Sequence, residues 1–337
     1  MRGTGLSTFA LCITASFGSV TSPTRTYIRC AMVSEGENGT VHSVVSYLHG
    51  EQPIDCTQNA ELMVLKCGDK QRVKKVQVEW DNVLESFKRE SECLSTVLTE
   101  SWSPALIEYF VTTDGEPCIA MEHLGENLKQ IREKIPEKFR FSSVTLGSMG
   151  ARMVDILQAL HQSHGRMHRS IHSEHWALSR SDPQNLVLID YGHCRSMQPF
   201  DYKSANRNAL DDLKQIPMDL RYLFDGDSRY YMWKHLNSFR EVEICQEIHP
   251  QLCLLLVYAN FLRPEDPIDY KFFREILVGM AQETGMKYTG QILWVDEKKV
   301  SKAESDSTRA DWIAENDTWM NRTWLYFLGY WELLEQM

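Results

Sequence analysis

The sequence predicts an α+β fold in two lobes, a small strand-rich lobe followed by a larger helical lobe. The first observation is a series of short apolar segments with strand character that ends near residue 121. The second is a change to longer segments with helical periodicity from Ser142 onward. The third is the length of 337 residues, which suits one large two-lobed domain or two ordinary ones.

The small lobe is expected to hold several strands and one helix. The segment Glu61–Lys66 (E-L-M-V-L-K) is typical of an apolar strand that ends in a lysine. Residues Leu106–Val111 and Pro117–Met121 predict two strands joined by a turn at Asp114-Gly115. Between them, Val83–Leu98 follows a helical period. The apolar residues expected on the buried face of this helix are Leu84, Phe87, Leu94 and Val97.

The large lobe is expected to be mainly helical. Met149–His164 carries an apolar stripe at helical spacing, and Gly165 suits the C-terminal cap of that helix. Leu186–Asp190 (L-V-L-I-D) predicts a short strand. Further apolar runs at Leu252–Leu262 and Phe272–Met280 predict two later helices.

Several short segments, taken in chain order, carry residues that could position a phosphate group. Lys66 ends the segment M-V-L-K, and Glu90 is the candidate partner of this lysine on the next helix. Glu85 is the alternative partner, because the spacing from Lys66 to Glu90 is long. The remaining segments are Met121-Glu122-His123-Leu124 after the last strand, Met167–His175 (M-H-R-S-I-H-S-E-H), and Asp190-Tyr191-Gly192.

Taken together, these segments resemble protein kinases of the casein kinase I group. Asp190-Tyr191-Gly192 looks like the magnesium-binding D-F-G motif, with the aromatic exchange of the vaccinia-related kinase branch. Phe141–His168 is similar to the tau-tubulin kinases. Gly125–Leu128 (G-E-N-L), Asp211-Asp212-Leu213 at the expected start of a buried helix, and Asp269–Leu277 (D-Y-K-F-F-R-E-I-L) add to the likeness.

The resemblance implies a domain organisation and a set of binding residues. It covers about residues 43–285, with an N-lobe at about 43–121 and a C-lobe at about 125–285. Residues 1–42 are then a leader, and residues 286–337 a tryptophan-rich extension. The implied nucleotide-binding residues are Gly50, Lys66, Glu90, Met121, Glu122, Leu124 and Asp190, with Asp190 as the magnesium ligand.

The catalytic segment departs from the family pattern at three positions. Ser170 stands where the family has the aspartate that accepts the substrate proton, and a serine hydroxyl has no useful basicity near neutral pH. His172 replaces a lysine that contacts the transferred phosphate. His175 replaces an asparagine that binds the second magnesium, an ion that prefers oxygen ligands. An alternative interpretation of His168, His172 and His175 is a transition-metal cluster.

The candidate glycine loop and the segment after Gly192 also lack features that kinases use to bind nucleotide and substrate. The segment Gly50–Asp55 is the candidate glycine loop and keeps one glycine of three, while Pro53 lacks a backbone amide for a phosphate. The stretch between Gly192 and Asp212 is short and holds no A-P-E-like motif, which argues against ordinary binding of a peptide substrate.

We therefore expect a pseudokinase that serves as a scaffold or allosteric regulator, with ATP and magnesium binding weakened. The alternative is an unconventional, slow Ser/Thr kinase in which Asp190 both binds magnesium and orients the substrate. Lys66, Glu90 and Asp190 fit either residual nucleotide binding or an internal salt-bridge network. A protein partner is expected to bind the large lobe or the tryptophan-rich tail, because tryptophan is favoured at interfaces.

The net charge, the cysteine spacing and the N-terminal segment give expectations about the cellular compartment and the binding partners of the protein. The net charge of −10 argues against nucleic acid as a partner, and no run after residue 31 is long enough for a membrane span. The nine cysteines are scattered singly, so we expect mostly reduced, buried thiols. An intracellular location (cytoplasm or nucleus) is favoured, while a secretory signal peptide, a mitochondrial presequence or a disordered leader over residues 1–31 all stay open. Three N-glycosylation sequons, which begin at Asn38, Asn316 and Asn321, do not decide between these, since such triplets often arise by chance.

Overall fold

The protein divides into two compact units, Met1–His123 and Leu124–Met337. The structure is a computed structural model. It describes residues 19–36, 38–52, 56, 63–75, 79–135, 141–197, 202–225, 250–263, 266–282 and 287–294. The tryptophan-rich segment of residues 295–337 and residues 1–18 of the expected leader lie outside the described residues. Among the described residues, no helix is both long and apolar enough to cross a membrane.

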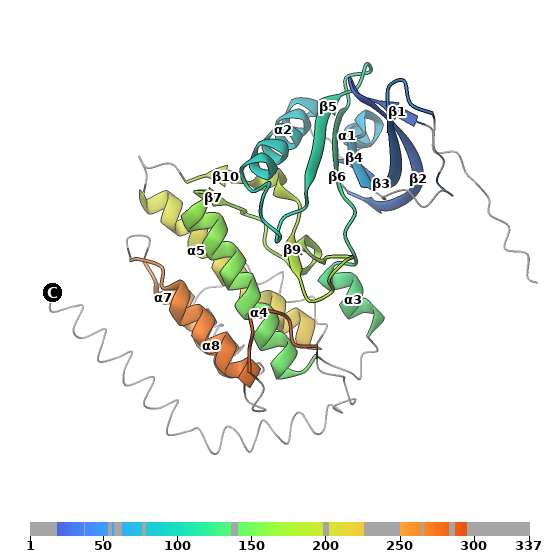
Figure 1. The fold of residues 1–337 in the computed structure, drawn as a ribbon. Coiled ribbons are helices and arrows are strands. Elements are labelled where there is room, and N and C mark those ends of the chain that lie inside the picture. Colours follow the sequence, from blue (N-terminus) through green and yellow to red (C-terminus); the bar gives the residue numbers. More distant parts are fainter. Residues whose placement is uncertain are drawn as a thin grey trace, which may run out of the picture. The chain divides into compact units, whose positions relative to one another are not determined.

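The first unit is built on a curled sheet of six antiparallel strands in the order β1-β2-β3-β4-β6-β5 (Figure 1). Its core is formed where apolar side chains of these strands meet, and the rings of Tyr27 and Phe110 stack there with centroids 5.6 Å apart. The strands are β1 (Ser19–Thr21), β2 (Arg25–Glu35), β3 (Gly39–Leu48), β4 (Met63–Gly68), β5 (Leu106–Val111) and β6 (Pro117–Glu122).

Two helices complete the first unit, α1 (Lys70–Lys75) and α2 (Trp80–Thr96). Helix α2 packs on β5 and β6 and lies across one face of the sheet (Figure 1). Its buried positions recur every three or four residues, as expected for a helix with one face in the core. They include Val83, Phe87, Glu90 and Leu94.

The sheet begins earlier in the chain than the sequence predicts. The expected domain boundary at residue 43 falls inside β3, and residues 19–35 already supply β1 and β2. The prediction of a leader is therefore wrong for residues 19–36 and 38–42, which belong to the sheet and its turns. Strand β2 was hard to recognise because its second half is exposed and two register shifts interrupt its pairing with β3.

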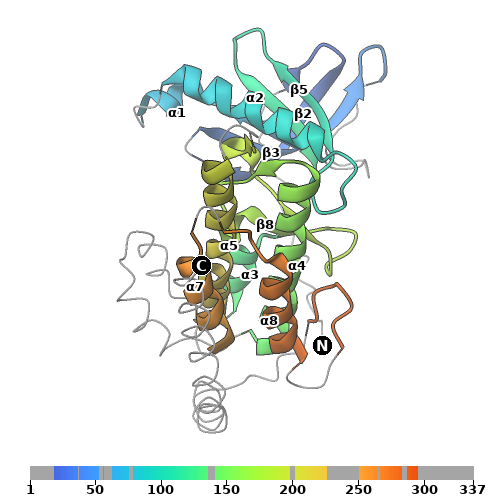
Figure 2. The same cartoon turned by 90° about the vertical axis from the view of Figure 1, so that its left-hand side faces the viewer.

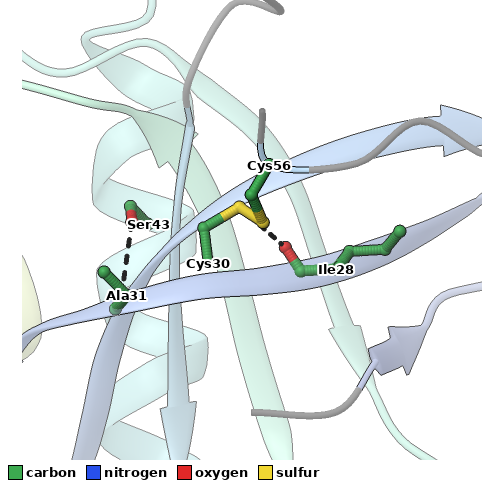
Figure 3. Close-up of a disulfide and its surroundings, with 5 residues drawn as sticks. All are labelled: Ile28, Cys30, Ala31, Ser43 and Cys56. Carbon is green, nitrogen blue, oxygen red and sulfur yellow. Dashed lines mark hydrogen bonds between the residues drawn. A yellow bond between two sulfur atoms is a disulfide. The ribbon is translucent and has the colours of Figure 1, made fainter. Parts of the chain in front are cut away.

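Disulfides correct the prediction of reduced cysteines, because six of the described cysteines are disulfide-bonded: Cys30, Cys56, Cys67, Cys93, Cys118 and Cys194. Cys30 on β2 is bonded to Cys56, after β3 (Figure 3). Cys67 on β4 is bonded to Cys118, its direct cross-strand partner on β6. Beside the first of these, the Ser43 hydroxyl donates a hydrogen bond to the carbonyl oxygen of Ala31 (Figure 3). The disulfides thus link β2 to the segment before β4, and β4 to β6.

The described part of the second unit is mainly helical. Helices α4, α5, α7 and α8 lie side by side (Figure 2). Helices α4 and α8 approach closely because α4 has glycines at the contact: a Cβ added at Gly147 would lie 2.5 Å from the backbone nitrogen of Ala281. The helices are α3 (Leu128–Lys134), α4 (Ser143–Gln158), α5 (Tyr202–Asp225), α7 (Pro250–Phe261) and α8 (Tyr270–Gln282).

Short strands and single turns lie between α4 and α5. Helix α4 continues into a π-helical turn, Ala159–Ser163, and Gly165 follows with a φ of +59°. Strands β7 (Arg166–Met167) and β10 (Arg195–Ser196) pair with each other, as do β8 (Trp176–Leu178) and β9 (Leu186–Leu188). The 3-10 turns Ser173–His175 and Tyr191–His193 complete this region, which carries the candidate catalytic residues.

Candidate functional site

In the first unit, Lys66 and Glu90 form an ion pair. Lys66 lies on β4 and Glu90 on α2, and Lys66 Nζ is 2.7 Å from Glu90 Oε2. The Glu90 side chain is only 3% exposed and the Lys66 side chain 22%. A carboxylate this deeply buried needs a cation, so the pair also holds α2 to the sheet. The alternative partner, Glu85, instead contacts Arg89 one turn along α2, at 3.6 Å.

The turn between β2 and β3 lies at the Lys66 end of the sheet. In the β3–β4 register, Val41 is opposite Lys66 and Gly39 is opposite Gly68. The Gly36 amide donates to the Gly39 carbonyl at 2.9 Å, which closes the turn. A Cβ added at Gly39 would lie 1.9 Å from the carbonyl oxygen of Cys67, so only glycine fits against β4 here. The sequence interpretation missed this turn as a candidate phosphate-facing loop.

Gly50 lies at the opposite end of β3, which corrects its assignment as the glycine loop. Strand β3 runs from Gly39 to Leu48, and at about 3.3 Å per residue Leu48 lies roughly 20 Å from Val41 along the strand. Gly50, with a φ of +95°, belongs to the turn in which the Glu51 amide donates to the Leu48 carbonyl. A loop in that place cannot share a phosphate with Lys66.

The other nucleotide-binding candidates lie around residue 123, where the first unit ends. Met121 is buried on β6, opposite Val64 of β4. The Glu122 amide donates to the Ala105 carbonyl at 3.0 Å, and the Glu122 carboxylate accepts from the Ala105 amide at 3.3 Å. Leu124 is half-buried at the start of the second unit. Their roles toward a nucleotide stay predictions.

In the second unit, Asp212 of α5 fixes the backbone of the candidate catalytic segment. Its carboxylate accepts hydrogen bonds from the backbone amides of His168 at 2.8 Å and Arg169 at 2.7 Å. Asp212 is 2% exposed, and His161 Nε2 lies 3.1 Å from it. This support lets Arg169 hold the left-handed φ of +68°, which is strained for a residue with a side chain.

The role of Asp212 was missed in the sequence, although the D-D-L segment was singled out. Helix α5 begins at Tyr202 rather than at Asp211, so Asp212 lies well inside the helix. A second carboxylate of α5, Asp219, accepts from the Ser173 amide at 3.0 Å. An aspartate on the apolar face of an amphipathic helix was the available signal, because a buried carboxylate needs hydrogen-bond donors.

His168 is packed inside the second unit. It is fully buried, and its Nε2–H donates to the carbonyl oxygen of Ile189 at 3.0 Å. Burial lowers the pKa of His168 to about 4, because the charged form is poorly solvated there. His168 is therefore a neutral structural residue at pH 7.

His175 lies between Ser170 and Asp190. Its Nδ1 is 2.6 Å from the backbone carbonyl oxygen of Ser170, and its Nε2 is 3.1 Å from Asp190 Oδ2. A carbonyl and a carboxylate only accept hydrogen bonds, so both ring nitrogens must donate, which the doubly protonated imidazolium does. The geometry thus favours a positively charged His175 paired with Asp190.

His172 stacks against His175, with ring centroids 3.6 Å apart. Burial, followed by the positive charge of His175, lowers the pKa of His172 to about 4. His172 is therefore neutral at pH 7 and cannot supply the positive charge of the lysine that it replaces.

The residues around Asp190 do not fit a magnesium ion. Asp190 has a left-handed φ of +63°, and its side chain is 39% exposed. The neighbouring donors of Ser170, His172 and His175 are one hydroxyl and two imidazoles, whereas magnesium prefers oxygen ligands. The charge on His175 further opposes a divalent cation on the same carboxylate. For the alternative of a transition-metal cluster, the described residues contain no group of three or more His, Cys, Asp or Glu side chains that could hold a metal ion.

The fold is that of the protein kinases. A solved structure of vaccinia related kinase 3 superposes with a TM-score of 0.55 at 13% sequence identity, and the match covers 82% of this chain and 95% of that chain. At this identity the likeness shows the fold alone. No family model matches the chain, and no curated protein matches its sequence.

Proposed function

We propose that this chain is a casein kinase I-like pseudokinase, which binds a protein partner as a scaffold or allosteric regulator. The observation that carries the proposal is the pairing of Asp190 with His175 at 3.1 Å. An internal cation neutralises the one carboxylate that a kinase of this type would use for magnesium. The chain therefore has no need of the ion to satisfy this group.

The remaining departures support the same conclusion. Ser170 offers no base for a substrate hydroxyl, and His172 is neutral at pH 7. Phosphoryl transfer depends on positioning and on neutralising the charge of the transferred group. Neither of these two positions supplies a charge for that task, while the backbone just before them is held by Asp212.

One observation favours a second candidate, a weak nucleotide-dependent kinase. The Lys66–Glu90 pair is intact, and in an active kinase such a lysine contacts the nucleotide phosphates. The same pair is also accounted for by the need to neutralise buried Glu90. The two candidates differ in whether the chain binds ATP with magnesium.

Thermal unfolding of the full chain distinguishes them. Ligand binding raises Tm by mass action, and a ligand at about 100 times its Kd adds about 2.7 kcal/mol to stability. We expect no magnesium-dependent rise in Tm at millimolar ATP for the wild type. A rise that is lost in both Lys66→Ala and Asp190→Asn would overturn the proposal and favour the weak kinase.

The partner surface is proposed to lie on the second unit or in residues 295–337. The tail is the stronger candidate, because tryptophan side chains often anchor interfaces. Replacing Trp312, Trp319 and Trp324 with alanine separates the two locations in a co-precipitation with a candidate partner. Binding that survives the replacement assigns the surface to the second unit.

A further inference from the structure

Two disulfides within the first unit, Cys30–Cys56 and Cys67–Cys118, point to an oxidising compartment. Cys67 and Cys118 are 2% and 0% exposed on neighbouring strands, and Cys30–Cys56 spans a separation of 26 residues. Protein thiols stay reduced in the cytosol, and structural disulfides persist in secreted proteins and in the secretory pathway. This evidence is independent of the N-terminal residues, which lie outside the described part of the chain.

One N-glycosylation sequon lies in a described surface turn. Asn38-Gly39-Thr40 joins β2 to β3, and Asn38 is half-exposed beside the exposed Glu35 and Gly36. The Asn38 carbonyl accepts from the Asp69 amide at 3.2 Å, so the backbone of the turn is held. Within the described part of the chain, no hydrogen bond engages the side-chain amide of Asn38, the group that a glycan would modify.

We propose that the chain matures in the secretory pathway and that Asn38 carries an N-linked glycan. Nδ2 of Asn38 attacks the anomeric carbon of an oligosaccharide donor linked to a lipid pyrophosphate. The new N–C bond forms as the bond from that carbon to the pyrophosphate oxygen breaks, the amide nitrogen loses one proton, and the lipid pyrophosphate leaves. Thr40 supplies the hydroxyl that the sequon requires.

The glycan has a consequence for the first unit. Gly39 is opposite Gly68, two residues along β4 from Lys66, so the sugar is attached at the Lys66 end of the sheet. An N-glycan is bulky and strongly hydrated. In an active kinase a phosphate-covering turn must stay accessible to the nucleotide, whereas in a binding domain the same turn can carry a sugar. The modification is separate from the proposed function, and each can fail without the other.

The test is made on the full chain expressed in insect or mammalian cells, once with its own N-terminus and once behind a heterologous signal sequence. Both forms carry Asn316→Gln and Asn321→Gln, so that Asn38 is the only sequon left. We expect a loss of apparent mass on treatment with peptide N-glycosidase F, with conversion of Asn38 to aspartate detected by mass spectrometry. Asn38→Gln and Thr40→Ala should abolish the shift, and Thr40→Ser should keep it.

Each form of the chain can overturn one part of the proposal. An unmodified Asn38 in the form with the added signal sequence would overturn the site itself. Free thiols at Cys67 and Cys118 in the form with its own N-terminus, detected by alkylation without prior reduction, would overturn the secretory assignment. Thr40→Ser is the matched control, since it keeps the hydroxyl and changes only one methyl group on β3.

Discussion

His175 Nε2 lies 3.1 Å from Asp190 Oδ2, and the opposite ring nitrogen of His175 lies 2.6 Å from the carbonyl oxygen of Ser170. One imidazole thus bridges two of the positions where a protein kinase holds its catalytic charges. A single substitution at Ser170 or His175 therefore cannot restore the charges that an active kinase holds at all of these positions.

Ser170→Asp alone should therefore show no kinase activity. The new carboxylate supplies a base, but Asp190 stays paired with His175 and His172 stays neutral. Phosphate transfer from labelled ATP to a casein-type substrate measures the outcome. The triple variant Ser170→Asp, His172→Lys, His175→Asn is the comparison, and robust transfer by the single variant would contradict the pseudokinase assignment.

Stability should fall as the pH is lowered from 7 to 5. The pKa of His168 is about 4 in the folded protein and near 6.5 when unfolded, so the unfolded chain binds the proton first. The stability of the neutral form is complete above pH 6.5 and is lost as pH falls toward 4. At pH 5 this one group contributes a loss of about 2 kcal/mol.

Urea unfolding at the two pH values measures this loss. His172 titrates in the same direction, so His172→Gln should reduce the dependence on pH while the protein stays folded. Equal unfolding midpoints at pH 7 and pH 5 would contradict the assignment of His168 and His172 as neutral residues.

Lys66→Met should destabilise the protein by about 3 kcal/mol, because it removes the lysine that pairs with the buried Glu90 carboxylate. The double variant Lys66→Met, Glu90→Leu should recover most of this loss, since it removes both charges. Denaturant unfolding of the wild type, the two single variants and the double variant gives the coupling energy. Additive single effects would show that the pair contributes no coupling.

Gly39→Ala should destabilise the protein more than Gly50→Ala. The new Cβ at residue 39 would lie 1.9 Å from the Cys67 carbonyl oxygen, which requires backbone movement and a cost of about 3 kcal/mol. At Gly50 the space is open and only the left-handed φ of +95° is unfavourable, for about 1 kcal/mol. Thermal unfolding of both variants tests this ranking. A larger loss of stability for Gly50→Ala than for Gly39→Ala would contradict the close approach of Gly39 to the Cys67 carbonyl.

Removing the disulfide Cys30–Cys56 by the double change to serine should cost about 3.5 kcal/mol in the loop-entropy account, given its separation of 26 residues. Unfolding in urea with and without reductant measures the effect. The wild type with reductant should approach the variant treated with the same reductant, since the remaining disulfides are then open in both. A wild type that is insensitive to reductant would show that this bond contributes nothing to stability.

Helices and strands whose hydrophobic pattern is visible within a few residues were predicted correctly from the sequence. The two strands around Gly115, with its φ of +75°, and the amphipathic helix α2 lie close to their expected bounds. Lys66 was placed on its strand for the same reason, because alternation and an apolar run are visible within a few residues. The kinase fold followed from the order of these segments, and the likeness to a solved kinase confirms it.

Features that depend on contacts between residues far apart in the sequence could not be predicted from the sequence alone. The glycine loop was predicted at Gly50 because the register that puts Val41 opposite Lys66 is decided by contacts between strands. The disulfide partners Cys67 and Cys118 are 51 residues apart, and spacing alone does not reveal connectivity. The His175–Asp190 pair required the positions of both side chains, which the replacement of an asparagine by histidine did not give.

Asp212 holds the segment after β7 by main-chain amides. Every amino acid except proline supplies such an amide, so the anchoring is indifferent to the identity of the side chains that the segment displays. The side chains of Ser170, His172 and His175 can then be replaced while the backbone of the segment keeps its position. A lineage could lose its chemistry here by point substitutions without unfolding, and an engineer could use the same segment to display new side chains.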